Sequence, residues 1–378
     1  MTTRRELLQR AAAVAATGLV AGGCASPSAS ATPAVAADGT RPGEAALGEA
    51  HVSTAVLQRI SVGSCADQTK PHPFWEAMAA DAPDLHLFCG DNVYASAQPW
   101  KAETLNAGYA MLVAKPEFER FRRQVRHLAV WDDHDYGSND AGIEFTHKAE
   151  SKAAFLDFFG VPASDERWGR DGIHHARRFG PPGRCVQVLV LDTRWNRSPW
   201  TPTDQRDAPG KQRYVPTTDT TRTMLGESQW QWLAARLAEP ADVRLIVSGI
   251  QVIAEGHGFE HWGLFPHEQQ RLLDLIGARR ANGVLLVSGD RHIGAVYRRE
   301  RGAPYPITEL TSSGLTHAWS TASEPGPNRL GELVRANHYA LIDIDWAARQ
   351  LTLKHHGERG GLPLQQHTLA LDPLAVRA

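Results

Sequence analysis

The stretch "HLAVWDDHDYGSND", residues 127–140, decides how this chain folds and where its chemistry lies. A mostly apolar run of strand length ends abruptly in three aspartates and one histidine, which fill residues 132–135. A surface loop can carry such charge without a purpose. At the end of a buried strand the charge needs partners, because an ionised group buried without compensation costs much free energy. The first question is therefore what these acids face.

Similar apolar runs recur along the chain and alternate with helical patterns. Predicted strands cover residues 60–64, 85–90, 127–131, 186–191, 244–249 and 283–289. Predicted helices cover residues 152–160, 227–239 and 266–281, where the last two repeat apolar residues every three or four positions. This alternation predicts an α/β fold. The runs at residues 305–313, 339–345 and 350–356 have fewer helices between them, so they are expected to be antiparallel strands at the end of the sheet.

Residues suited to bind ligands follow five of these predicted strands. In open α/β sheets the carboxyl ends of the strands form one edge where ligands bind, so these side chains should converge. Several carboxylates in one cleft repel one another, and some would take up protons unless cations were bound between them. The acids are therefore predicted to face metal. The full set of predicted metal ligands is Cys65, Asp91, Tyr94, Asp133, Gln251, Asp290 and His292.

The ligand types divide this set into two predicted metal sites. Cys65, Tyr94 and His292 offer thiolate, phenolate and imidazole, which suit a strongly Lewis-acidic ion such as ferric iron. Asp133, Gln251 and Asp290 offer oxygen only, which suits a hard ion such as calcium or magnesium. Asp91 could bridge the two sites. Two ions roughly 3.5–4 Å apart would clamp a phosphate and activate water.

The ordered motifs resemble the alkaline phosphatase D (PhoD-like) family of metallophosphatases, relatives of the purple acid phosphatases within the calcineurin-like superfamily. The motifs are "GSC", "GDNVY", "WDDHDYGSND", "LDTRW", "SGIQV", "SGDRH" and "ELTSSG", and they extend from about Arg59 to about Ile344. The resemblance implies a calcineurin-like four-layer α/β/β/α sandwich. It also implies an iron and calcium (Fe3+, Ca2+) site at which metal-activated water hydrolyses phosphate esters.

The sequence departs from the wider superfamily at several ligand positions. Cys65 stands where an aspartate is usual, and Asp133-His134 replaces Asn-His. Gln251 replaces a histidine, and Asp290 replaces the first histidine of the GHxH motif. These changes leave one metal with cysteine and tyrosine and remove imidazole from the other. Asn139 could serve in place of Gln251.

Three further residues are predicted to act on the substrate. The family resemblance does not require His134 as a ligand, so it is predicted to be the general acid for the leaving oxygen or a hydrogen-bond donor to the transition state. Arg291 and Arg194 are candidates to hold phosphate oxygens. Arg194 could instead form a structural ion pair with Asp192. Asp132 and Asp135, which flank Asp133 and His134, are expected to orient their neighbours or the loop rather than to contact metal.

The predicted function is hydrolysis of phosphate esters, as a phosphodiesterase, an alkaline phosphomonoesterase or both. One alternative is a non-haem iron oxidoreductase, which would usually show two histidines and one carboxylate at an open iron. Another is a non-catalytic envelope binding lipoprotein on a metallophosphatase scaffold. That scaffold should have lost metal ligands, and none is obviously lost here.

Charge, length and composition limit the other kinds of protein that this chain could be. The chain has 378 residues and a formal net charge of -2, which gives no footprint for specific nucleic-acid binding. It is 42% hydrophobic, enough for a large core. Three cysteines lie beyond the leader, an odd number, so at least one is free, metal-bound or paired elsewhere. Cys89 and Cys185 lie in apolar runs and are expected to be core residues.

The N-terminal part is predicted to direct export. Residues 1–23 resemble a twin-arginine signal, with Arg4-Arg5 before a short Ala-rich apolar stretch; a Sec signal is the alternative. "VAGGC" resembles a lipobox that would place a lipid anchor on Cys24, with ordinary cleavage near "CAS" as the alternative. Residues 24–56 are predicted to be a flexible linker and residues 57–372 one domain. The twin-arginine export machinery would then be a partner, and the periplasm or cell envelope the location.

Overall fold

The computed structural model describes residues 52–372 and 374–375. The predicted leader, Cys24 and the linker up to residue 51 lie outside the described residues. Within the described ranges, no helix combines the length and the apolar character needed to span a bilayer.

One sheet has eight strands in the order β1-β5-β6-β7-β8-β10-β9-β11. Its central strands β6, β7, β8 and β10 are parallel, and β6 and β8 are buried at every position. Continuous Val/Leu runs such as these are typical of parallel strands that are covered on both faces. The strands are β1 (Val52–Ser53), β5 (His175–Phe179), β6 (Val186–Val190), β7 (Val243–Ser248), β8 (Val284–Ser288), β9 (Gly294–Arg299), β10 (Ile307–Ser312) and β11 (Arg329–Val334).

The second sheet has six strands in the order β14-β13-β12-β2-β3-β4. Strands β2, β3 and β4 are parallel, whereas β12 runs antiparallel to both β2 and β13. The strands are β2 (Arg59–Gly63), β3 (Leu85–Cys89), β4 (His127–Val130), β12 (His338–Asp345), β13 (Gln350–Gly357) and β14 (Pro363–Ala370).

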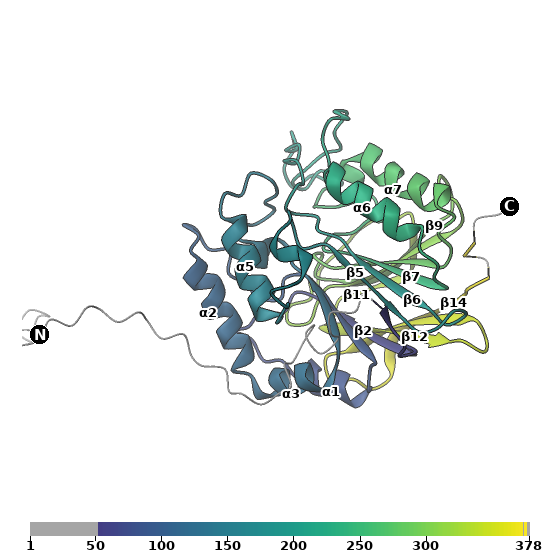
Figure 1. Cartoon of the computed structure of the whole chain (residues 1–378). Helices are drawn as coiled ribbons and strands as arrows, with labels where there is room; N and C mark the ends of the chain where they lie inside the picture. Colours follow the sequence, from purple (N-terminus) through teal and green to yellow (C-terminus); the bar gives the residue numbers. More distant parts are fainter. Residues whose placement is uncertain (1–51, 373, 376–378) are drawn as a thin grey trace, which may run out of the picture. The chain divides into compact units, whose positions relative to one another are not determined.

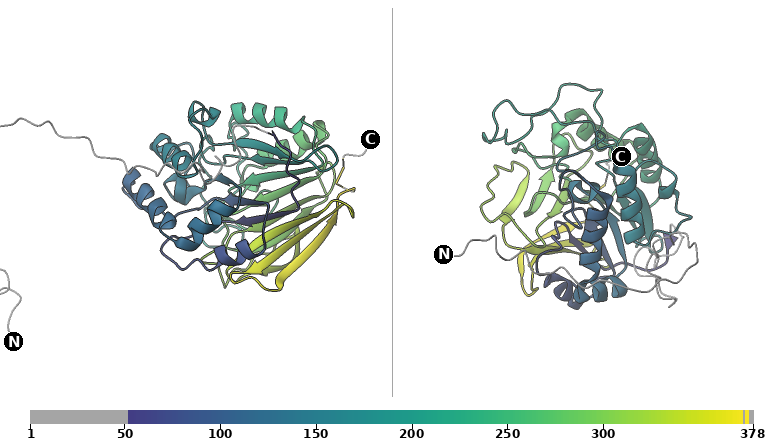
Figure 2. Two further views of the ribbon diagram at one scale, coloured as in Figure 1. Left: turned by 60° about the horizontal axis from the view of Figure 1, so that its bottom comes forward. Right: turned by 90° about the vertical axis from the view of Figure 1, so that its left-hand side faces the viewer.

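The two sheets pack face to face and helices cover their outer faces (Figures 1 and 2). Strand β4 contacts β6, and β12 contacts β9 and β10. Helices α6 and α7 cover the eight-stranded sheet, and α1, α3 and α5 lie on the other side, where Phe88 of β3 packs on Phe118 of α3. The predicted four-layer α/β/β/α sandwich is confirmed. The helices are α1 (Phe74–Ala80), α2 (Ala102–Val113), α3 (Pro116–Gln124), α4 (Asp133–Tyr136), α5 (Lys148–Phe158), α6 (Glu227–Leu237) and α7 (Pro266–Ala278).

Two details differ from the sequence-based expectation. Strand β10 is parallel to β8, and only its other neighbour, β9, is antiparallel, while β12 and β13 join the second sheet. The reason is that local patterns define a strand but not its neighbour, which is chosen by packing. In addition, β1 pairs with β5, so Val52 and Ser53 of the predicted linker take part in the fold.

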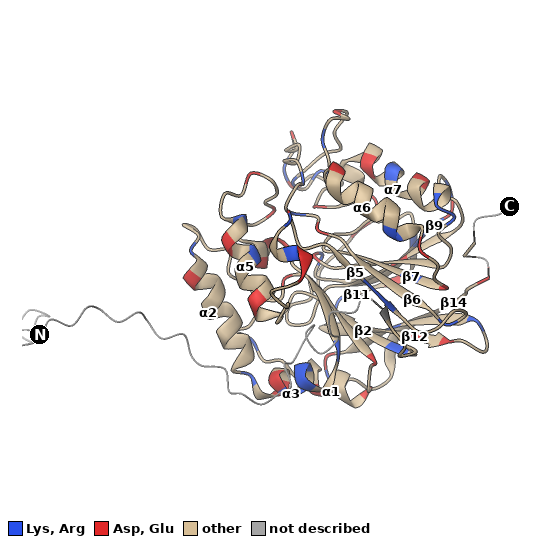
Figure 3. Ribbon diagram, viewed as in Figure 1, with Lys and Arg blue, Asp and Glu red and all other residues tan. Residues whose placement is uncertain are grey.

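Many of the charged residues lie on helices and loops (Figure 3). The acids that follow the strands combine charge with burial. Asp91, Asp132, Asp133 and Asp135 each expose 2% or less of their surface.

Candidate metal centre

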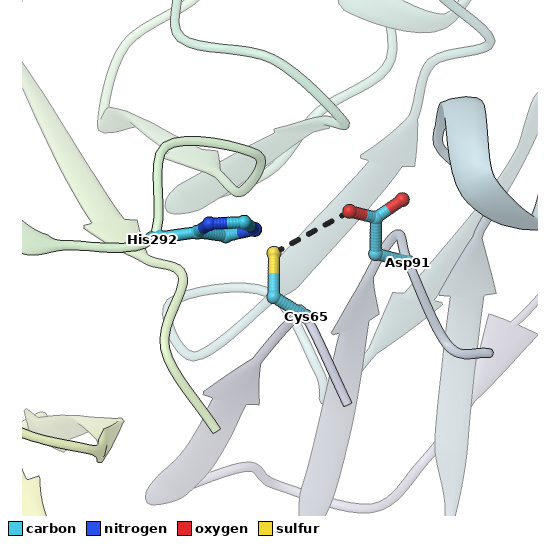
Figure 4. A group of neighbouring side chains, drawn as sticks. All are labelled: Cys65, Asp91 and His292. Carbon is cyan, nitrogen blue, oxygen red and sulfur yellow. Dashed lines mark hydrogen bonds between the residues drawn. The ribbon is translucent and has the colours of Figure 1, made fainter. Parts of the chain in front are cut away.

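The predicted ligands lie on loops that leave the carboxyl ends of strands in both sheets. Cys65 follows β2, Asp91 follows the adjacent β3, and Asp133 follows β4. Asp290 and His292 follow β8 of the other sheet. Figure 4 shows Cys65 and Asp91 projecting from neighbouring strand ends toward His292, which comes from a loop on the opposite side. The metal centre therefore joins the two sheets.

Four of these residues adopt left-handed backbone conformations that side chains other than glycine rarely adopt. Their φ values are 63° for Cys65, 49° for Asp91, 69° for Asp290 and 54° for His292. Such a conformation costs about 1–3 kcal/mol at each residue and persists only where the surrounding structure enforces it. Strain of this kind clusters at functional sites, and here it turns the side chains toward one another.

The first group contains a thiol, a phenol, a carboxylate and an imidazole. The Sγ atom of Cys65 lies 3.6 Å from Oδ2 of Asp91. The hydroxyl of Tyr94 lies 3.1 Å from the same oxygen and 3.2 Å from Nε2 of His292. Ligand atoms of Cys65, Asp91 and His292 all lie within 4.8 Å of one another. The structure thus brings together the residues of the first predicted metal site.

The second group contains carboxylates and shares Asp91 with the first. Ligand atoms of Asp91, Asp133 and His134 lie within 4.8 Å of one another, and so do those of Asp132, Asp133 and Asp290. Oδ2 of Asp91 faces Cys65 and Tyr94, whereas its Oδ1 accepts a hydrogen bond from the backbone of His134. One carboxylate thus faces both groups, which is the arrangement expected of a bridging ligand.

A buried oxygen of Asp133 supports a cation at this position. Oδ2 of Asp133 accepts from the backbone N–H of Asp140 at 2.8 Å. Oδ1 is buried without a hydrogen-bond partner among the described residues, and its nearest cation, Arg194, lies 3.9 Å away. Since buried polar atoms are nearly always satisfied, an exception needs an explanation, and a bound cation supplies one.

The pKa values of the ligands indicate the same need for positive charge. Burial, followed by the charges of Asp133 and Asp132, raises the pKa of Asp91 well above its usual value. Burial and the nearby Asp91 likewise raise the pKa of the Cys65 thiol and of the Tyr94 phenol. Burial also disfavours ionised Asp133, but His134 and Arg194 outweigh it and lower the pKa of Asp133 to about 2. Bound cations would offset the raised pKa values of Cys65, Asp91 and Tyr94 and so favour the ligating forms of these groups.

A pocket of about 410 Å³ opens onto the cluster. His134 lies in it with Nδ1 2.7 Å from the hydroxyl of Ser96 and its ring 4.2 Å from that of Tyr94. Arg291 also lines the pocket, pairs with Glu324, and lies with its guanidinium carbon 4.1 Å from the centre of the Phe259 ring. The lining residues are Asp91, Asp133, His134, Asn139, Asp140, Arg206, Asp207, Arg213, Phe259, Glu260, Asp290, Arg291, His292 and Trp319.

Arg194 does not face this pocket. Its side chain is fully buried, and Nε donates to Oδ1 of Asp132 at 2.7 Å. Its two terminal nitrogens donate to the carboxylate of Glu260 at 2.7 and 2.8 Å. The structural ion pair therefore exists, but with Asp132 and Glu260. Asp192 instead accepts from Trp131 Nε1 and from backbone N–H groups, including that of Arg194.

Gln251 is also separate from the cluster. Its Nε2 lies 3.2 Å from the Tyr297 hydroxyl and 3.1 Å from Thr311 Oγ1, and its Oε1 lies 3.0 Å from Nε2 of His257. Both ends of the amide thus have protein partners, and Gln251 does not line the pocket. The alternative residue, Asn139, does line it.

The other acids near the cluster have different roles. Asp135 accepts from the backbone of Asp132 and from Asn92, so it holds the loop in shape. Asp132 anchors Arg194. Asp140 and Glu260 were not predicted, yet both line the pocket and lie with Asp133 in a further acidic group. Asp140 belongs to the quoted stretch, but Glu260 lies in a loop without a recognisable motif.

Comparison with known proteins agrees with this geometry. The family model described as PhoD-like phosphatase matches residues 60–358. Alkaline phosphatase D of Bacillus subtilis (strain 168) is 24% identical over 273 residues, which is 62% of this chain and 45% of that protein. The chain therefore spans about half the length of this curated relative.

Solved structures show the same fold. A structure of PhoD matches with a TM-score of 0.68 and 16% identity, over 86% of this chain and 72% of that one. The purple acid phosphatase PPD1 from yellow lupin (Lupinus luteus) matches with a TM-score of 0.58 and 11% identity, over 84% of this chain and 54% of the other. The fold is that of the calcineurin-like metallophosphatases, as predicted. Because the family model covers most of its length, the chain belongs to the PhoD-like phosphatase family.

Proposed function

We propose that the protein is a metal-dependent phosphoric ester hydrolase. The observation that carries the proposal is the carboxylate of Asp91, whose two oxygens face two different groups of potential ligands. Such an arrangement fits two neighbouring cations, which when bound would hold phosphate oxygens, offset developing negative charge and lower the pKa of water.

The donor sets favour different ions in the two positions. Cys65, Tyr94 and His292 suit ferric iron, because thiolate and phenolate are strong donors to such an ion. Asp133 and Asp290 offer carboxylate oxygen alone, which suits calcium. We therefore propose an Fe3+ and Ca2+ centre that shares Asp91.

His134 is well placed to give a proton to the leaving oxygen. The hydroxyl of Ser96 engages Nδ1, so Nε2 is the nitrogen that can face the substrate. The ring packs against Tyr94 at 4.2 Å, which limits its rotation. General-acid catalysis by a positioned group contributes roughly 10²–10⁴-fold to rate. Loss of the His134 side chain should therefore slow hydrolysis most for esters with poor leaving groups.

Arg291 is the cation best placed to hold a phosphate oxygen. One terminal nitrogen pairs with Glu324, and the guanidinium lies against Phe259, so the side chain is fixed. Its Nε is buried without a hydrogen-bond partner among the described residues. A fixed donor of this kind stabilises developing charge without reorganisation. The geometry favours Arg291 over Arg194, whose nitrogens are already used by two carboxylates.

A direct assay tests the function. Hydrolysis of p-nitrophenyl phosphate and bis-p-nitrophenyl phosphate should be measured with the metal-loaded protein, before and after chelation. We expect turnover of the diester and some turnover of the monoester, lost on chelation and restored by metal. A protein that holds its metals but turns over neither substrate would contradict the proposal and favour the non-catalytic binding protein.

We also propose export to the periplasm or cell envelope. The support is the sequence of residues 1–24, with Arg4-Arg5 and the lipobox-like Cys24. Expression with the natural leader, followed by fractionation and mass analysis of the mature N-terminus, tests both the twin-arginine route and the lipid anchor. Full-length protein that remains in the cytoplasm would contradict the proposal.

A further inference from the structure

An exposed tryptophan lies at the mouth of the pocket. Trp319 exposes 38% of its surface and lines the pocket together with Asp290 and His292. The other large apolar residues that are exposed in the described ranges are Met111, Ile143, Leu362 and Leu364, and these do not line this pocket. Isolated exposed apolar side chains are ordinary, but one at the entrance of a polar pocket is placed to contact a ligand.

The position of Trp319 is fixed by several contacts. Its backbone N–H donates to the carbonyl oxygen of His292 at 2.6 Å, which ties it to a predicted metal ligand. Its indole N–H donates to the hydroxyl of Thr321 at 2.8 Å. Its ring meets that of Phe259 edge to face, with centroids 5.7 Å apart and an interplanar angle of 88°. A ring held in this way loses little freedom when a ligand packs on it.

Two arginines lie beside these rings, and each also pairs with an acid, Arg291 with Glu324 and Arg213 with Asp140. The guanidinium carbon of Arg291 lies 4.1 Å from the centre of the Phe259 ring and 5.8 Å from that of Trp319. Arg213 lies 5.6 Å from the Phe259 ring and also lines the pocket. The pocket mouth therefore combines flat apolar surface with cations, whereas its base carries the acids of the metal centre. This combination suits an anion that carries a ring.

We infer that Trp319 and Phe259, with Arg291 behind them, form a subsite for a planar aromatic ring on the organic group of a phosphate ester. The inference rests on the proposed function, since it assumes that the phosphorus lies over the metal centre. The organic group must then extend toward the pocket mouth, where the Trp319 ring is available for stacking. Aryl esters are therefore preferred over alkyl esters of similar charge.

Binding of two phosphonates tests the subsite without any turnover. Phenylphosphonate and methylphosphonate carry the same anionic group, so titration calorimetry on the metal-loaded protein isolates the contribution of the ring. We expect wild type to bind phenylphosphonate roughly tenfold more tightly. Trp319→Ala should remove most of this preference, whereas Trp319→Phe, which also loses the bond to Thr321, should retain most of it. Leu362→Ala, at a side chain that is 90% exposed and outside the pocket, is the matched control and should keep the full preference.

Kinetics separate a failure of this inference from a failure of the proposed function. Bis-p-nitrophenyl phosphate and methyl p-nitrophenyl phosphate release the same leaving group but differ in the group that remains. The ratio of their kcat/KM values should fall about tenfold in Trp319→Ala. Equal binding of the two phosphonates by wild type, or an unchanged preference in Trp319→Ala, would overturn the subsite. A preserved ring preference without hydrolysis of any ester would support the subsite and overturn only the proposed function.

Discussion

The guanidinium of Arg194 donates from Nε to Oδ1 of Asp132 across 2.7 Å, and both side chains are completely buried. The same arginine holds Glu260 with its two remaining nitrogens. Asp132 immediately precedes Asp133 and Glu260 lines the pocket, so Arg194 supports the metal centre from behind. It is a positioning residue for the acids around the proposed metals.

Removing the charge of Arg194 should therefore reduce stability. Arg194→Met leaves the buried carboxylate of Asp132 without its cation and removes two donors from that of Glu260, and we expect a loss of about 3–5 kcal/mol in the free energy of unfolding. Urea denaturation of the metal-loaded protein measures it. If Arg194 instead held phosphate at an open site, its loss would raise KM and leave stability nearly unchanged. Arg206→Met, at an exposed arginine of the pocket rim, is the control for stability.

Substitution of the ligands should separate the two proposed metals. Cys65→Ser should lose most of the transition ion and keep the hard ion, and Asp290→Asn should do the opposite. Asp91→Asn should deplete both, because its carboxylate faces both groups. Elemental analysis and visible absorption measure occupancy, and we expect activity to fall about 100-fold or more. Cys185→Ser, at a cysteine remote from the pocket, should retain both metals. If Asp91→Asn lost only one metal, the bridging role would be wrong.

The proton donor can be identified with leaving groups of different acidity. His134→Gln should slow hydrolysis of phenyl phosphate by roughly 10²–10⁴-fold and that of p-nitrophenyl phosphate much less, because p-nitrophenolate leaves without a proton. Ser96→Ala should give a smaller effect in the same direction, since it frees the His134 ring without removing it. Rates for a series of substituted phenyl phosphates provide the measurement. Equal losses for all leaving groups would exclude His134 as the general acid.

Two buried histidines should make the protein sensitive to acid. Burial lowers the pKa of His338 to about 4, and burial together with His338 lowers that of His355 to about 3. An unfolded histidine has a pKa near 6.5, so the unfolded state binds more protons below that pH. Their contribution to stability is complete above about pH 6.5 and falls toward pH 4 by about 1.4 kcal/mol per pH unit for each histidine.

The variant His338→Gln isolates this effect from other acid-sensitive groups. Its free energy of unfolding should fall less steeply than that of wild type between pH 6.5 and 4. Parallel curves for wild type and His338→Gln would show that His338 does not titrate as expected.

The strands and the polar residues that follow them could be predicted from sequence, because both leave a local pattern in it. Runs such as residues 85–89 have the length and composition of buried strands, and the polar residues after β2, β3, β4 and β8 meet at the sheet edge. The partners of β12 and β10 could not be predicted in this way, because strand pairing is set by contacts between distant segments. The resemblance to a known family supplied the two-sheet arrangement.

Two predicted site residues, Arg194 and Gln251, do not line the pocket, and the physical reason is the same for both. A sequence shows that Arg194 or Gln251 follows a strand, but not whether the side chain points into the pocket or into the protein. Arg194 points inward because Asp132 and Glu260 satisfy its charge there, and Gln251 because Tyr297, Thr311 and His257 bind its amide. Such burial depends on partners that are far away along the chain.

The left-handed conformations of Cys65, Asp91, Asp290 and His292 have a practical consequence. Each of these residues would relax to an ordinary conformation if its loop were cut from the two sheets that hold it. Synthetic peptides that copy the individual loops should thus bind metal weakly, even with every donor atom present. Transplanting the centre into another protein would require a scaffold that reproduces four left-handed backbone conformations at once.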